Sequence, residues 1–174
     1  MSGRITTKYA GRNDLYDVAV LLHNCWQAEY RQIILDEYLD KMSIEERYKG
    51  LLMRFDGFAS EFLMMLDGDR LIGASVFGMS FTKGYEDDGE VSAIYLRKEY
   101  IGKGLGSRLF LETERALSAK GYRGIVLDLL EGNTRAFGFY LKHGYTKVSE
   151  GSVMLGENEY PLAVLRKAVR DDNR

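Results

Sequence analysis

The stretch Glu99–Leu109, "EYIGKGLGSRL", places glycine at three alternate positions, Gly102, Gly104 and Gly106. The run before it, "EVSAIYL", is typical of a β-strand, and the run after it, "SRLFLETERAL", is typical of an amphipathic helix. The first N–H groups of a helix have no partner inside it, and the helix dipole adds positive charge there. Glycine lets the main chain approach a ligand and adopt positive φ. The stretch therefore indicates a main-chain anion site of the kind that holds phosphate.

Two common phosphate-binding patterns do not describe this loop. The pattern G-x-x-x-x-G-K-[ST] fails because Arg97 stands where its first glycine is required. The dinucleotide pattern G-x-G-x-x-G meets Ser107 or Leu109 at its last glycine, depending on where it starts. A glycine-rich turn without a ligand stays open as the alternative interpretation.

The rest of the chain narrows the class of protein. Its 174 residues and net charge of -2 are typical of one globular domain, expected over 1–174, and they do not favour nucleic-acid binding. The sequence shows no apolar run long enough to cross a bilayer and no apolar segment of a secretory signal at its start. Cys25 has no second cysteine to pair with, so we expect a cytoplasmic protein. His23 and His143 are far apart and outside any Cys/His cluster, so no metal is expected.

Periodicity and turn signals predict the order of elements. The expected strands and helices are strand 3–9, helix 15–30, helices 36–42 and 43–55, strands 58–66, 71–81 and 90–96, helix 105–120, strand 124–130, helix 133–143, and strands 145–155 and 160–168. Asn13 or Asp14, Ser43 and Asn133 are candidate helix caps. The order β-α-α-β-β-β-α-β-α-β-β predicts an α/β fold with a mixed, mostly antiparallel sheet flanked by helices, and its one strand–helix–strand crossover carries the glycines.

Two motifs together resemble the GNAT superfamily of N-acetyltransferases. The glycine loop is similar to the family's [QR]-x-x-G-x-[GA] acyl-CoA loop. Ile101 stands at the first position of this pattern, where the family usually has Gln or Arg. "NTRAFGFYLKHGY" (133–145) is similar to the family's N-x-x-A-x-x-[FL]-Y-x-x-x-G-[FY]. The resemblance spans residues 3 to 168 and is strongest over 90–145, and it implies a GNAT-like fold and acetyl-CoA as cosubstrate.

The resemblance also assigns roles to residues. Tyr140 falls on the position of the family's general-acid tyrosine, and the alternative is that it is a core aromatic. Glu90 falls where several members carry the general-base glutamate, and the alternative is an exposed glutamate at the start of a strand. The main chain of Ile94 and Leu96 would pair with the pantetheine arm. The cofactor contacts implied are Ile94, Tyr95, Leu96, Ile101, Gly102, Lys103, Gly104, Leu105, Gly106, Ser107, Asn133, Ala136 and Tyr140.

The acceptor side is less defined by sequence. Trp26 and Tyr30 are one helical turn apart and face the same way, so they are candidates for the acceptor pocket, beside Glu90, or for the core. The loop 83–90 has three more negative than positive charges, because Glu86, Asp87, Asp88 and Glu90 oppose Lys83. Such a loop would attract a cationic amine, or it is merely solvated.

Three functions remain open at this point. The first is acetyl transfer to a small cationic amine, as the loose likeness of the end of the chain to polyamine acetyltransferases implies. The second is the same chemistry on a protein N-terminus or lysine, and the third is a non-catalytic acyl-CoA-binding module. Monomer and homodimer are both open. No nucleic-acid or membrane partner is expected.

Overall fold

A computed structural model describes residues 4–57 and 59–169 of the chain. The elements are β1 (Ile5–Tyr9), α1 (Leu15–Glu29), α2 (Asp36–Lys41), α3 (Ile44–Asp56), β2 (Ser60–Asp67), β3 (Arg70–Met79), β4 (Gly89–Leu96), α4 (Leu105–Ala119), β5 (Gly124–Leu130), α5 (Thr134–Lys142), β6 (Thr146–Leu155) and β7 (Asn158–Ala168). The predicted order of strands and helices is confirmed. Gly3 and Phe58, which begin two of the predicted strands, lie outside the described residues.

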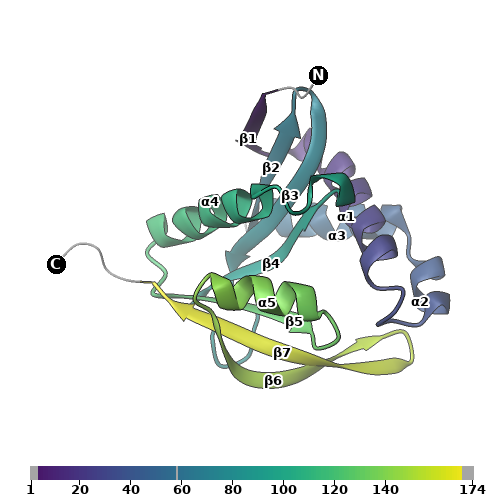
Figure 1. The fold of residues 1–174 in the computed structure, drawn as a ribbon, viewed down its shortest axis with the longest axis vertical. Helices are drawn as coiled ribbons and strands as arrows, with labels where there is room; N and C mark the ends of the chain where they lie inside the picture. Colours follow the sequence, from purple (N-terminus) through teal and green to yellow (C-terminus); the bar gives the residue numbers. More distant parts are fainter. Residues whose placement is uncertain (1–3, 58, 170–174) are drawn as a thin grey trace.

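The strands form one seven-stranded sheet in the order β1-β2-β3-β4-β5-β7-β6 (Figure 1). Neighbouring strands are antiparallel except for β4 and β5, which are parallel. These two strands pair only at Gly89 with Ile125 and at Glu90 with Val126. Beyond these two pairs, β4 and β5 diverge, and the sheet has an opening between them.

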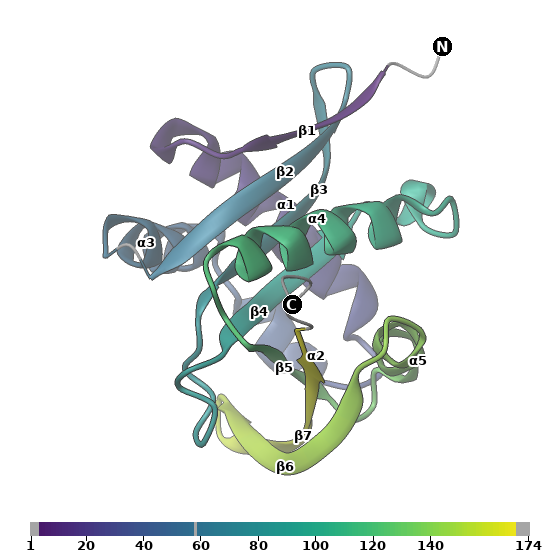
Figure 2. The ribbon, with the colours of Figure 1, turned by 90° about the vertical axis from the view of Figure 1, so that its left-hand side faces the viewer.

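Helices cover both faces of the sheet. Figure 2 shows α4 in front of the sheet and α1 and α3 behind it. Alternation along β2 explains this, because Phe62 and Met64 pack against α1 and α3 while Leu63 and Met65 belong to the core under α4 and α5. Among the described helices, none is both long and apolar enough to cross a membrane.

Local signals set several boundaries as predicted. The Ser43 hydroxyl accepts the Glu46 N–H at the start of α3, and the Asn133 side chain accepts the Ala136 N–H at the start of α5. The expected cap of α1 is wrong in detail. Asp14 precedes the helix but accepts the Gly11 N–H at 2.8 Å, which closes the preceding turn.

Candidate active site

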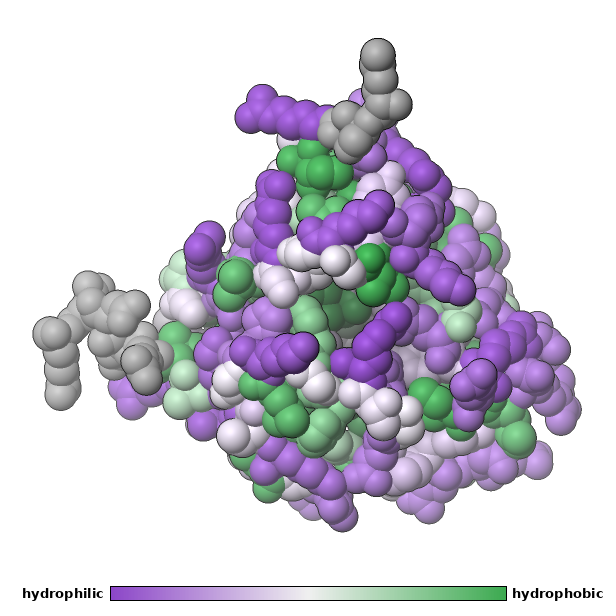
Figure 3. All heavy atoms as spheres, in the orientation of Figure 1, coloured by the Kyte–Doolittle hydropathy of each residue, from purple (hydrophilic) through white to green (hydrophobic). Residues whose placement is uncertain are grey.

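A cavity of about 500 Å³ occupies the opening between β4 and β5. Its walls come from the end of α1, from β4, from the glycine loop, from β5, from α5 and from the β6–β7 hairpin. Figure 3 shows, in the view of Figure 1, a hollow near the centre of this face with hydrophobic residues inside it and hydrophilic residues around it. This size and lining suit a small organic ligand.

The glycine loop forms one end of the cavity. Gly102 and Gly104 have φ of +80° and +77°, so a side chain at either position would be strained. Gly104 precedes α4, whose start has no side-chain cap among the described residues and no acidic residue in its first turn. A Cβ built on either glycine meets nothing within 4 Å. The loop therefore presents free N–H groups of a 15-residue helix to open space, as an anion site requires.

Not every residue of the loop shares this role. Gly106 lies inside α4 without positive φ, and its Cβ would lie 3.4 Å from Leu96 Cδ1, so the prediction of a left-handed conformation does not apply to it. Ile101 and Ser107 line the cavity. Lys103 and Leu105 do not: the Lys103 ammonium lies 5.4 Å from the centre of the Tyr100 ring, and Leu105 packs against the core.

The edge of β4 that faces β5 forms the long wall of the cavity. Residues 91 to 96 all line it, including Ile94, Tyr95 and Leu96. Past Glu90, β4 makes no ladder with β5, so the main chain on this side is available to a ligand. Ser92 is an extra residue in the pairing with β3, which is a bulge of the kind common beside active sites.

Tyr140 lines the cavity from α5 and is 8% exposed. Its ring packs on Phe110 at 5.4 Å and on Phe139 at 5.3 Å, so it contributes to the core as well. Burial raises the pKa of the Tyr140 phenol, and the nearby Asp128 and Glu29 carboxylates raise it further. The phenol therefore keeps its proton at any ordinary pH.

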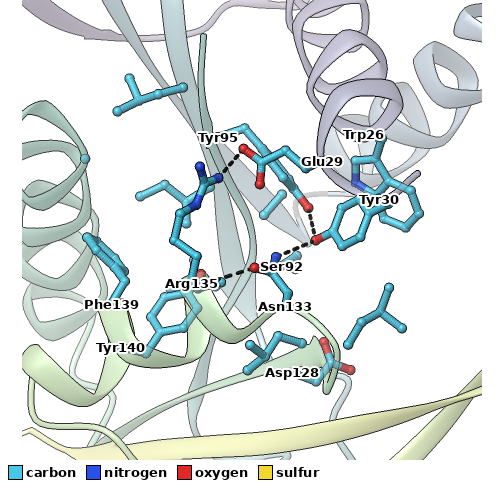
Figure 4. A pocket seen from close by; sticks show the side chains of 18 of the residues that line it. Trp26, Glu29, Tyr30, Ser92, Tyr95, Asp128, Asn133, Arg135, Phe139 and Tyr140 are labelled. Atoms are coloured by element: carbon cyan, nitrogen blue, oxygen red, sulfur yellow. Dashed lines mark hydrogen bonds and ion pairs between the residues drawn. The ribbon is translucent and has the colours of Figure 1, made fainter. Parts of the chain in front are cut away.

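A hydrogen-bonded network joins three elements in the cavity (Figure 4). The Tyr30 and Tyr95 hydroxyl oxygens are 2.9 Å apart, and Asn133 Nδ2 donates to the Tyr30 hydroxyl at 3.4 Å. Burial raises the pKa of both phenols. The Trp26 ring lies 4.6 Å from the Tyr30 ring, and both line the cavity although α1 ends one residue before Tyr30. Ala136 lines the cavity on the α5 side.

Glu90 is buried and does not line the cavity. Its carboxylate accepts the Phe81 N–H at 2.8 Å and hydroxyl groups of Ser80 and Thr82. Ser92 Oγ, which does line the cavity, lies 3.0 Å from the other Glu90 oxygen. The interpretation as an exposed strand-end glutamate is wrong, and Glu90 reaches the cavity only through Ser92.

Asp128 is one of two cavity carboxylates that the sequence analysis missed; the other is Glu29. Asp128 lines the cavity from β5, and its side chain is exposed to the open space there. Desolvation by the surrounding walls raises its pKa, and the negative charge of Glu90 raises it further. One signal was available: Asp128 is the single polar residue in the strand "GIVLDLL".

The acidic loop before β4 does not supply the charge of the cavity, contrary to expectation. None of residues 83–90 lines it. Asp88 is buried and forms a two-bond ion pair with Arg166, and Glu86 accepts the Gly84 N–H. The acidic groups of the cavity are instead Glu29 and Asp128.

Packing contacts narrow the acceptor side of the cavity. The Leu35 N–H donates to the Tyr160 hydroxyl at 3.1 Å, and Tyr38 lies against Gly156 at the tip of the β6–β7 hairpin. The segment after α1 and this hairpin share a hydrophobic cluster whose buried members are Tyr30, Ile34, Leu39, Leu130 and Leu155. These contacts join the segment after α1 to the tip of the hairpin and narrow this side of the cavity.

A second cavity of about 920 Å³ adjoins the first. The two share Glu29, Leu96, Ile101, Leu130, Asn133 and Arg135. Within residues 4–57 and 59–169, no group of three His, Cys, Asp or Glu side chains is arranged to hold a metal ion.

Comparison with known proteins identifies the class that this loop, edge and cavity define. The profile of the Acetyltransferase (GNAT) family matches residues 19–145, and the chain belongs to this family of acetyltransferases. It is 26% identical over 148 residues to the spermidine N(1)-acetyltransferase of Thermoplasma acidophilum, covering 84% of this chain and 92% of that protein.

Solved structures share the fold. The PaiA N-acetyltransferase of Thermoplasma acidophilum, in complex with coenzyme A, superposes with a TM-score of 0.76 at 24% identity and covers 95% of this chain and 99% of that one. YncA of Salmonella typhimurium, with acetyl-CoA, has a TM-score of 0.73 at 16% identity, with 99% and 98% covered. The predicted fold class is therefore confirmed.

Proposed function

We propose that the protein transfers the acetyl group of acetyl-CoA to the primary amine of a small cationic acceptor. The observation that carries the proposal is one cavity with a main-chain anion site at one end and aromatic and acidic side chains at the other. The likeness to a spermidine N(1)-acetyltransferase supports the same class of acceptor.

The residues present fit coenzyme A. The N–H groups beside Gly102 and Gly104 would hold its pyrophosphate, because the space next to each glycine is open and both require positive φ. The unpaired edge of β4 would hold its pantetheine arm in the manner of an added strand. When bound, the cofactor supplies an acetyl thioester that an amine attacks.

Tyr140 is the proposed proton donor. A departing thiolate needs a proton, and a phenol held close can provide it. Burial keeps Tyr140 protonated, so the donor form is fully populated at neutral pH. Asn133, which is fixed as the cap of the same helix, would orient the start of α5 toward the ligand.

Asp128 is the proposed proton acceptor. An alkyl amine with a pKa of about 10.4 is protonated at pH 7, and it must lose that proton before it attacks. Asp128 lines the cavity, and its raised pKa makes it a stronger base than an ordinary aspartate. Glu90, the base that the sequence suggested, would act behind Ser92 as a positioning group whose charge keeps the pKa of Asp128 high.

The residues and contacts around the acceptor side favour this proposal over its alternatives. A protein N-terminus or lysine needs an open groove between the first helices and the last hairpin, where the Leu35–Tyr160 contact lies. A non-catalytic module would need neither a buried phenol nor a carboxylate in the cavity.

A panel assay tests the proposed function. We expect CoA release from acetyl-CoA with polyamines and diamines, little with neutral or anionic amines, and little with peptides. The Asp128→Asn protein serves as the matched variant, and it should lose activity while retaining CoA binding. Reaction with peptides alone, or with none of the amines, would contradict the proposal.

A further inference from the structure

Glu29 and Arg135 form an ion pair across the cavity. Glu29 is the last residue of α1 and Arg135 is the second residue of α5. Figure 4 shows the Arg135 side chain extending from α5 to meet the Glu29 carboxylate. Both residues line both cavities, so the pair stands where the two cavities meet.

Each of these charges opposes the dipole of its own helix. A carboxylate is unfavourable at a helix C-terminus, and a guanidinium is unfavourable in a first turn. The last turn of α1 has no basic residue, and the first turn of α5 has no acidic one. Each charge is therefore stabilised across the cavity, by the other, rather than within its own helix.

The pair is suited to exchange partners. The Arg135 side chain is 59% exposed and that of Glu29 is 19% exposed, so the guanidinium is free to leave while the carboxylate stays in the wall. Exposed ion pairs are weak, and phosphate competes well for arginine. Arg135 lines the same cavity as Gly102 and Gly104, where the phosphates of the cofactor would bind.

We propose that Arg135 is a switch residue that leaves Glu29 for a cofactor phosphate, and that the freed Glu29 then binds the second ammonium group of a diamine or polyamine. This rests on the proposed function and names its acceptor class. Figure 4 shows Glu29 and Asp128 well apart in the cavity, so an acceptor with two ammonium groups would span them.

The charge of the cavity changes with the switch. With the ion pair closed, two carboxylates face one guanidinium and leave one net negative charge. With Arg135 on a phosphate, the phosphate neutralises the guanidinium, and Glu29 and Asp128 leave two net negative charges on the acceptor side. The cavity therefore attracts a dication more strongly once the cofactor is present. By linkage, the acceptor must strengthen cofactor binding by the same factor.

Titration calorimetry with CoA tests the first half of the proposal. Glu29→Gln should bind CoA about two- to fivefold more tightly than wild type, because Arg135 is no longer held by an exposed pair. Arg135→Ala should bind it about tenfold more weakly, since a charge-assisted bond is lost. The double variant should match Arg135→Ala, while Arg12→Ala, which breaks a distant surface pair with Asp56, should match wild type. Unchanged or weaker CoA binding by Glu29→Gln would overturn the switch.

Titration with 1,4-diaminobutane and 1-aminobutane, with and without saturating CoA, tests the second half. Wild type should bind the diamine several-fold more tightly with CoA, and this gain should be absent in Glu29→Gln and small for the monoamine. Equal affinity with and without CoA, or no diamine binding in either state, would overturn the role of Glu29. Product formation in the same samples with acetyl-CoA reports the proposed function separately. If no product forms while CoA still strengthens diamine binding, acetyl transfer to these amines is refuted and the switch is supported.

Discussion

Replacing two glycines of one loop with alanine should change stability in opposite directions. Gly104 has φ of +77°, and an added Cβ there meets nothing within 4 Å, so the cost of Gly104→Ala is the backbone strain alone. A left-handed conformation costs a non-glycine residue about 1–2 kcal/mol. Gly106 lies inside α4, and its Cβ would make an ordinary contact with Leu96. Alanine in place of a helical glycine gains about 0.5 kcal/mol.

The two variants should therefore differ by about 1.5–2.5 kcal/mol, which for a chain of this length is a difference of about 3–10 °C in Tm. Gly50→Ala in α3 is the matched control, since a Cβ there also meets nothing within 4 Å and Gly50 lies outside both cavities. It should gain about as much as Gly106→Ala.

Cofactor binding should follow a different order from stability. The methyl group at Gly104 enters the space that a phosphate needs, while that at Gly106 points toward Leu96 and Phe139. We expect Gly104→Ala to weaken CoA binding about tenfold or more, and Gly106→Ala to weaken it far less. Calorimetric melting and CoA titration on the same preparations measure both effects. If the Tm of Gly104→Ala equals that of wild type, or exceeds that of Gly106→Ala, the left-handed conformation at Gly104 is wrong.

Three further predictions concern proton transfer. Tyr140→Phe should retain CoA affinity, because the ring still packs on Phe110. Its kcat should fall by about 10²–10⁴-fold. A wild-type kcat in this variant would mean that Tyr140 is only a core aromatic. Asp128→Asn should raise Tm at pH 7 and leave it unchanged below about pH 3.8. The reason is that a carboxyl whose pKa is raised in the folded state destabilises the protein as pH rises from the ordinary pKa of the group to its folded pKa. Equal changes in Tm at both pH values would contradict the raised pKa of Asp128. Glu90→Gln should lower the pKa of Asp128 and move the acid limb of kcat/KM to lower pH. A uniform loss at every pH, with the acid limb unmoved, would contradict this effect of Glu90 on Asp128.

The fold was predictable because its signals are local. Each turn, cap and periodic run specifies its own element, and Ser43 and Asn133 cap helices that the pattern already indicated. The two motifs lie on consecutive parts of one strand–helix–strand–helix run, so the placement of the glycine loop beside Tyr140 followed from the order of elements.

The electrostatics of the cavity were not predictable in the same way. Glu29 and Arg135 are 106 positions apart, and no local pattern pairs them. Asp128, and not Glu90, lines the cavity, because the strand end that carries Glu90 is buried by the loop 80–82, while the divergence of β4 and β5 exposes Asp128. The extent of one domain over 1–174 and the oligomeric state stay predictions.

The features that carry the proposed function share one physical property, which is that each of them costs stability without a ligand. Gly102 and Gly104 are left-handed, the edge of β4 is unpaired beyond Glu90, Asp128 has a raised pKa, and the Glu29–Arg135 ion pair joins charges at the wrong ends of their helices. Exceptions of this kind to local rules are expected at functional sites. All of these exceptions border the same cavity. A bound anion relieves the open helix start and competes for Arg135, an extended arm pairs the strand edge, and an ammonium group favours the ionised form of Asp128, so one ligand pair accounts for exceptions that the fold alone does not explain.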